Sequence, residues 1–170
     1  MTNIKHKTDA AMPVTLPHYD ADGVLQNIVT VDESGAVNSV TEFYPDRSVK
    51  ATYEMKSGMK DGEFISFYPN GEIDEYGFFI ADKKNGRYTK NHPNGALWIE
   101  QTFMSGKLHG KVCYYDAQTG RMTLRMHLRQ DVLHGLYESF DSFGRKQASV
   151  NYRGGAENDA YVPAQEAVLF

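Results

Sequence analysis

Glycines recur at a nearly constant interval along this chain, and they fall into two parallel columns. The first column consists of Gly71, Gly95, Gly120 and Gly144, and the second of Gly62, Gly86, Gly110 and Gly135. Successive members of each column are 24 or 25 residues apart. Both columns take up their one extra residue around the segment Asp116–Gly120. Two columns that share one insertion indicate an internal repeat, and a repeat restricts the possible folds more than any other feature.

Apolar residues follow the same interval. One apolar column consists of Val31, Met55, Phe79, Phe103, Leu128 and Tyr152. The columns divide the chain into six copies, which are 19–42, 43–66, 67–90, 91–114, 115–139 and 140 onward. A unit of this length cannot bury a core alone, so we expect neighbouring copies to stack and to share their apolar columns.

Each copy has the pattern of a β-hairpin. The segment Tyr68–Gly71 reads Tyr-Pro-Asn-Gly, in which proline and glycine favour a tight turn. A longer strand such as 72–79 alternates with period two, a second turn such as Ser105–Gly110 follows, and a shorter strand such as 63–68 completes the unit. We therefore predict an all-β fold, an elongated antiparallel repeat sheet of about six β-hairpins, with little helix.

The ends of the chain depart from the repeat. We expect residues 1–18 to form a flexible N-terminal arm and residues 19–159 to form the hairpin repeat domain. The tail 160–170 ends in apolar residues. We expect this tail to cap the last edge of the sheet or to cover one of its faces.

Charge and composition narrow the classes of partner. The net charge is −4, and the segment Asp61–Asp82 contains six acidic residues without a lysine or arginine. No basic stripe with interleaved aromatic residues is present, which disfavours nucleic acid as a partner. Cys113 is the one cysteine, and no stretch has the length and hydrophobicity of a membrane span. We expect a cytoplasmic protein with a protein partner that has a basic surface, and no membrane contact.

Several segments resemble a known family. The segments FYPNGEI, NHPNGALW, SGKLHGKVCYY and GLYESFDSFGR are similar to the MORN-repeat variant, over most of residues 19–159. Proteins built mainly of this variant include the YwqK-type antitoxins of bacterial toxin–antitoxin pairs, and similar folds serve as immunity proteins or scaffolds. The resemblance implies an antiparallel repeat sheet and protein binding. It implies no catalytic residue. The chain departs from the family pattern at Arg47, Asp82 and Asp131, where the turns should contain glycine.

Candidate chemical groups have simpler explanations in the repeat. His109 and His134 occupy equivalent positions before a glycine and are typical of polar turn residues. Cys113 could be paired with His92 or His134 as nucleophile and base, but Cys113 occupies the repeat position of strand residues, so strand packing explains it. We therefore expect no enzyme activity, no cofactor, no metal site and no small-molecule substrate.

The repeat also indicates where a partner would dock. In the longer strands, period-two alternation places Tyr76, Phe78 and Trp98 on a face that is polar in the preceding copy. Exposed aromatic residues among carboxylates are typical of interface hot spots. Two alternatives are that the tail covers these rings or that both faces are partly packed. The predicted partner-binding residues are Glu72, Asp74, Glu75, Tyr76, Phe78, Trp98 and Glu100.

These observations favour a binding protein that neutralises a cognate bacterial toxin by direct contact through the repeat sheet. Acidic residues would then complement a basic surface on the toxin. An alternative is a scaffold or adaptor that organises other proteins or touches a membrane. Genomic context would distinguish the two, because an adjacent reading frame for a toxin favours neutralisation.

Overall fold

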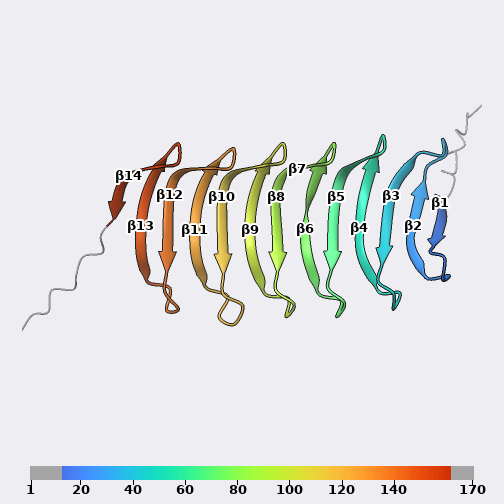
Figure 1. Ribbon diagram of the computed structural model, residues 1–170, viewed down its shortest axis with the longest axis horizontal. Helices are drawn as coiled ribbons and strands as arrows, with labels where there is room; N and C mark the ends of the chain where they lie inside the picture. Colours follow the sequence, from blue (N-terminus) through green and yellow to red (C-terminus); the bar gives the residue numbers. More distant parts are fainter. Residues whose placement is uncertain (1–12, 162–170) are drawn as a thin grey trace, which may run out of the picture.

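All strands of this chain lie in one antiparallel sheet (Figure 1), and the computed structural model describes residues 13–161. The strands are β1 (Val14–Tyr19), β2 (Leu25–Val31), β3 (Val37–Phe43), β4 (Val49–Lys56), β5 (Met59–Phe67), β6 (Ile73–Ile80), β7 (Lys83–Lys84), β8 (Gly86–Asn91), β9 (Leu97–Met104), β10 (Lys107–Tyr115), β11 (Met122–Arg129), β12 (Val132–Phe140), β13 (Lys146–Arg153) and β14 (Ala156–Tyr161). They follow chain order across the sheet, except that β7 pairs only with β6. The expected all-β sheet of antiparallel hairpins is confirmed.

The sheet extends beyond the first predicted copy. β1 pairs with β2 along its length, with Leu16 opposite Val29. The expected boundary between a flexible arm and the repeat domain, at residue 18, therefore falls inside a strand. β1 and the two-residue β7 bring the twelve expected strands to 14. Residues 1–12 and 162–170 lie outside the described residues, and so does the expected cap formed by the tail.

The turns at the lower edge in Figure 1 have the predicted chemistry. In the turn after β5, the Gly71 N–H donates to the Tyr68 carbonyl (2.9 Å), and the Tyr68 N–H donates to the Glu72 carbonyl (2.8 Å). Gly71 has φ 86°, the left-handed conformation that closes this three-residue hairpin loop. Arg47 takes the equivalent position with φ 70° and makes the same bond, to the Tyr44 carbonyl. The turn geometry therefore persists without glycine.

The turns at the upper edge are shorter than predicted. Ser105 and Gly106 both have positive φ, 53° and 85°, which is the geometry of a two-residue type I′ turn. β10 begins directly afterwards, at Lys107, so the turn expected over Ser105–Gly110 is wrong and the second strand of the hairpin is not the shorter one. Gly110 lies in an irregularity of the pairing inside β10, with φ 112°. The second glycine column therefore marks bulged strand positions.

Two aspartates at upper turns link neighbouring copies. Asp82 has φ 62°, its N–H donates to the Lys60 carbonyl (2.9 Å), and its Oδ1 accepts from the Lys60 N–H (2.8 Å). Asp131 repeats the arrangement with the backbone of Leu108, at 2.9 and 2.8 Å. Both aspartates replace an expected turn glycine, and each adds a side-chain bond that glycine cannot make.

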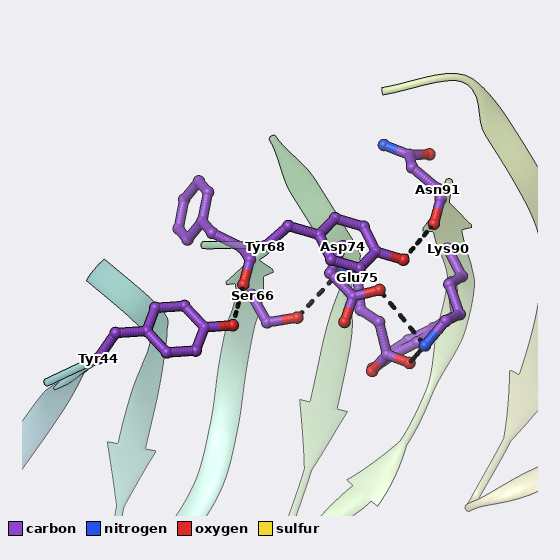
Figure 2. A network of polar contacts seen from close by, with 9 residues as sticks. Tyr44, Ser66, Tyr68, Asp74, Glu75, Lys90 and Asn91 are labelled. Carbon is purple, nitrogen blue, oxygen red and sulfur yellow. Dashed lines mark hydrogen bonds and ion pairs between the residues drawn. The ribbon is translucent and has the colours of Figure 1, made fainter. Parts of the chain in front are cut away.

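Tyrosines link neighbouring copies at the lower edge. The Tyr44 hydroxyl donates to the Phe67 carbonyl and the Tyr68 hydroxyl donates to the Asn91 carbonyl, both at 2.8 Å (Figure 2). Each bond spans 23 residues of sequence. Both edges of the sheet therefore carry contacts between copies in addition to the strand ladders.

The two faces of the sheet differ in composition. One of them, here the aromatic face, carries a row of rings in contact from β4 to β9, and a further pair in β12 and β13. The rings are Tyr53, Phe64, Phe79, Tyr88 and Phe103, and then Tyr137 and Tyr152. The other, here the opposite face, carries side chains that alternate with these along each strand, such as Ile65, Tyr76 and Cys113.

Tyr88 occupies the most protected position of the ring row. Its side chain is 3% exposed, and its ring stacks on that of Phe64 at 6.4 Å between centroids. Gly77 lies between the two, because β6 separates β5 from β8. A Cβ at Gly77 would come within 2.1 Å of Tyr88 Cδ2, so the absence of a side chain there leaves room for the ring. Lys84 Nζ covers the same ring at 3.6 Å.

Candidate partner-binding surfaces

Bulges divide the predicted binding residues between the two faces. In β6, Glu75 pairs with Ser66 but Ile73 pairs with Phe67, so Asp74 is an extra residue. In β9, Ile99 pairs with Lys90 and Leu97 pairs with Asn91, so Trp98 between them is the extra residue. Strict alternation therefore fails at both positions. The expectation that Asp74 and Trp98 share a face with Tyr76 is wrong.

Asp74 and Trp98 lie on the aromatic face, around Lys90. Lys90 Nζ lies 3.3 Å from Asp74 Oδ1 and 3.1 Å from Glu75 Oε1 (Figure 2). The same ammonium lies 6.0 Å from the centroid of the Trp98 ring, which stacks on His92 at 5.2 Å. Trp98 is the most exposed part of this group, at 37%.

The carboxylate of Glu75 is held by its neighbours on the aromatic face. Its Oε2 accepts from the Tyr88 hydroxyl at 2.8 Å. Burial acts to raise the pKa of Glu75, but the hydrogen bonds from Tyr88 and Lys90 and the charge of Lys84 outweigh it, so the pKa lies below its usual value. Burial first, and then the bond to Glu75, raises the pKa of Tyr88. Glu75 is therefore a structural anion, because both of its carboxylate oxygens have a partner within the chain.

Tyr76 and Phe78 form an aromatic pair on the opposite face, in which Tyr76 is half-buried and Phe78 is exposed. Their rings meet edge to face at 5.8 Å, and Phe78 is 44% exposed. Ile80, two residues further along β6, is 54% exposed. The Tyr76 hydroxyl donates to Glu63 Oε1 at 2.8 Å, and this bond raises the pKa of the tyrosine. Glu54 Oε2 in turn accepts from the Glu63 N–H at 3.0 Å.

We call the group Glu54, Glu63, Tyr76, Phe78 and Ile80 the Tyr76 patch. It consists of apolar side chains on β6, bordered by two carboxylates on β4 and β5. Sequence reasoning identified Tyr76 and Phe78 but missed the other three. Register alone could have identified Ile80, because it lies two residues after Phe78 on the same strand.

Glu100 and Glu72 lie away from the Tyr76 patch. Glu100, on the opposite face of β9, forms an ion pair with Arg87 (2.8 Å) and accepts from the Tyr115 hydroxyl (3.4 Å). The Glu72 carboxylate reaches the next lower turn, since a Cβ at Gly95 would lie 2.6 Å from its Oε2. Neither carboxylate adds to the border of the patch.

The acidic run Asp61–Asp82 does not form one acidic surface. Asp61 Oδ2 accepts from the Ala81 N–H (3.1 Å), and Asp82 binds backbone at an upper turn. Asp74 and Glu75 pair with Lys90 on the aromatic face. Of the six acids in the run, only Glu63 borders the aromatic pair. The number of acidic residues in this segment therefore overstates the negative charge of any one surface that they reach.

The remaining chemical groups of the sequence analysis lie within strands. Cys113 is buried in β10, and burial is the main cause that raises the pKa of its thiol. His109 and His134 belong to β10 and β12, so the turn assignment for both is wrong. Within residues 13–161, no three His, Cys, Asp or Glu side chains form a group that could hold a metal ion. The same part of the chain has no helix of the length and hydrophobicity that crossing a membrane requires.

Comparison with known proteins identifies one repeat. Residues 60–81 match the family model of the MORN repeat variant. This segment includes most of β5 and all of β6, which carry the aromatic pair of the Tyr76 patch. No curated protein matches the chain. The chain thus contains a MORN-variant repeat, and such a repeat suggests a protein-binding or scaffold role.

Proposed function

We propose that this chain binds a protein toxin and neutralises it by direct contact, and that the Tyr76 patch is the docking site. One observation carries the proposal, namely an edge-to-face aromatic pair on one face of the sheet, in which Phe78 is exposed and the half-buried Tyr76 is fixed by a carboxylate. Aromatic anchors held in one conformation lose little entropy on binding and are typical of hot spots. The proposal assigns the chain no catalytic step, no cofactor and no nucleic-acid partner.

The border of the patch supports a partner with a basic surface. Glu54 and Glu63 are exposed, and their positions are fixed by the bond between Glu54 Oε2 and the Glu63 N–H. No cation forms an ion pair with either carboxylate among the ion pairs of residues 13–161. Carboxylates that are not paired with an internal cation can attract lysines and arginines and accelerate encounter.

The proposal is tested with the double variant Tyr76→Ala/Phe78→Ala. Affinity capture with the tagged chain supplies candidate partners, and each is tested for growth inhibition that co-expression of this chain relieves. The double variant should weaken binding about 30-fold or more, since buried anchors contribute at least about 2 kcal/mol. The control is Phe143→Ala, because Phe143 is 71% exposed on a distant lower turn. Unchanged affinity of the double variant would place the docking site elsewhere.

A scaffold role is the second candidate, and the position of Trp98 favours it. Trp98 and the Tyr76 patch lie on different faces, so the sheet offers two aromatic surfaces that two proteins could occupy together. If the chain is a scaffold, Trp98→Ala should abolish capture of one partner and leave capture of the other unchanged. If the chain is a neutralising protein with one docking site at the Tyr76 patch, Trp98→Ala should change its affinity for the toxin little. Mass measurement of the captured assemblies distinguishes one partner from two.

A further inference from the structure

A cavity with basic walls lies at the C-terminal end of the sheet, far along the repeat from the Tyr76 patch. Its volume is about 430 Å³ and its lining residues come from β11, β12 and β13. They are Arg129, His134, Gly135, Asn151, Tyr152 and Arg153. Arg129 and Arg153 are the last residues of β11 and β13, so both guanidinium groups approach from the upper edge.

The walls of the cavity are rich in donors. Two guanidinium groups, one imidazole and one amide line it, and among the residues whose side chains the structure describes, no carboxylate lines it. Arg87, Arg125 and Arg145 each form an ion pair with a carboxylate of this chain. Among the side chains of residues 13–157, no hydrogen bond or ion pair engages the guanidinium groups of Arg129 and Arg153. Their charge therefore remains available to a ligand.

The same register in earlier copies carries different chemistry. The repeat positions equivalent to Arg129 and Arg153 are occupied by Asp32, Lys56, Ile80 and Met104 in order along the chain. Ile80 and Met104 are exposed apolar side chains, and Ile80 belongs to the Tyr76 patch. Only the last two copies place arginines on adjacent hairpins at this position. Strand pairing does not require arginine at this position, because other residue types occupy it in the earlier copies.

Gly135 opens the floor of the cavity. It has φ 102°, and a Cβ there would point at the Cβ of His127, 3.4 Å away. Because Gly135 has no side chain, space remains between Arg129 on one hairpin and Asn151 on the next. The backbone thus provides a recess, and the side chains around it provide positive charge.

We propose that this cavity binds a phosphate monoester group, either as a free small molecule or on a phosphorylated protein side chain. A phosphate monoester carries nearly two negative charges near neutral pH, which match the two guanidinium groups. Guanidinium presents a planar fork of donors that binds phosphate oxygens in pairs. Asn151 and His134 add donors to the oxygens that the arginines leave free.

The proposal is tested on the full chain by titration with O-phosphoserine, inorganic phosphate and succinate at constant ionic strength. Amide shifts of Gly135 and Asn151 in two-dimensional NMR report binding at the cavity. The expected result is saturable shifts with O-phosphoserine and phosphate, and weaker ones with succinate. Arg129→Ala and Arg153→Ala should each reduce affinity about tenfold. Each variant removes hydrogen bonds between a guanidinium and the phosphate, and the loss of a charged hydrogen bond weakens binding by about that factor.

The matched control is Lys56→Ala, which removes a cation from the same repeat position outside the cavity. It should leave the titration unchanged. Arg129 and Arg153 are exposed, so circular dichroism should show folded variants. Absence of saturable shifts, equal binding of succinate, or equal losses in Lys56→Ala and Arg129→Ala would each overturn the proposal. A phosphoserine peptide that binds more tightly than O-phosphoserine would indicate a phosphorylated protein as the source, and equal affinity a free phosphate compound.

Discussion

The middle of the sheet, β5 to β9, and its C-terminal part, β10 to β13, use the same repeat positions with different side chains. Tyr88 in the middle corresponds to Val112 in the next copy, and both are almost fully buried on the aromatic face. On the opposite face, the repeat positions of Tyr76 and Phe78 are occupied two copies later by Arg125 and His127. Arg125 pairs there with a buried carboxylate, Glu138, which also pairs with Lys146. At this position, the opposite face therefore carries rings in the middle of the sheet and an ion pair in its C-terminal part.

This difference shows which positions of the repeat are constrained. Turn residues and bulge glycines fix the backbone, and they recur in nearly every copy. Side chains between them need only fill a half-buried site, and rings, aliphatic chains or ion pairs all do so. Variation at these positions allows one backbone to carry an aromatic patch in the middle and a basic cavity near its end. The functional differences along this sheet therefore come from the repeat positions whose side chains vary between copies.

The largest expected effect is from truncation of Tyr88. Tyr88→Ala removes ring contacts with Phe64 and Phe103 and the hydroxyl bond to Glu75. We expect a loss of about 3–5 kcal/mol in the free energy of unfolding, measured by urea denaturation. Val112→Ala at the equivalent position should cost about 1–3 kcal/mol. Equal losses would show that the rings add nothing beyond their burial.

A second effect should be specific to the C-terminal part. Glu138 is 2% exposed and accepts hydrogen bonds from Arg125 and Lys146. The bond from Lys146 is the main cause that lowers the pKa of Glu138, with Arg125 adding to it against burial. Glu138→Gln keeps the shape but removes the charge. Because both cations reach solvent, the loss near neutral pH should be about 2 kcal/mol.

The pH dependence gives the sign of the Glu138 effect. Since the folded pKa is depressed, the stabilisation is complete above the unfolded pKa of about 4.3, and it is lost as pH falls through the folded value. Denaturation midpoints of the wild type and Glu138→Gln should therefore converge in acid. Tyr88→Ala serves as the control, because its deficit derives mainly from packing and should persist. A constant gap for Glu138→Gln would exclude the ionic explanation.

A third and smaller effect concerns the space under the ring of Tyr88. Gly77→Ala places a Cβ 2.1 Å from Tyr88 Cδ2, so the ring must shift away from Phe64. We expect a cost of about 1–2 kcal/mol. Gln101→Ala, at the equivalent position in the next copy, should cost less than about 0.5 kcal/mol. Hydrogen exchange should locate the Gly77→Ala loss in β5 to β8. Uniform faster exchange would instead indicate a cooperative sheet.

Sequence reasoning predicted the repeat and its hairpins because their signals are local. A Tyr-Pro-Asn-Gly segment requires a particular turn, whatever its neighbours are. The two-residue turn at Ser105–Gly106 was missed because a glycine four positions after Gly106, Gly110, also resembled a turn residue. Glycine satisfies both a turn and a bulge, and only the strand register distinguishes them.

The candidate site was predicted less completely, since one extra residue per bulge reverses the facing of a side chain. Tyr76 and Phe78 lie beyond the bulge and keep the predicted face, whereas Asp74 and Trp98 are the bulged residues. Partners across copies were also invisible. The bond from Tyr76 to Glu63 depends on pairing that periodicity does not specify. Contacts between residues far apart in sequence follow from the strand register of the folded sheet. The repeat period shows only which copy of the repeat a residue belongs to.

The smallest predicted effect tests whether the cations over the rings are needed. Lys84 Nζ lies 3.6 Å from the centroid of Tyr88, and Leu108 occupies the equivalent position of the C-terminal part. Burial is the main cause that lowers the pKa of Lys84, and the charge of Glu75 only partly offsets it, so the ammonium is costly at this site. Lys84→Leu should therefore change the free energy of unfolding by less than about 0.5 kcal/mol, because leucine covers the ring as the lysine stem does. Lys84→Ala, which uncovers the ring, should cost about 1 kcal/mol. If Lys84→Leu lowers the free energy of unfolding as much as Lys84→Ala does, the ammonium itself stabilises the middle of the sheet. Lysine at this position could then not be replaced by the leucine that the C-terminal part uses.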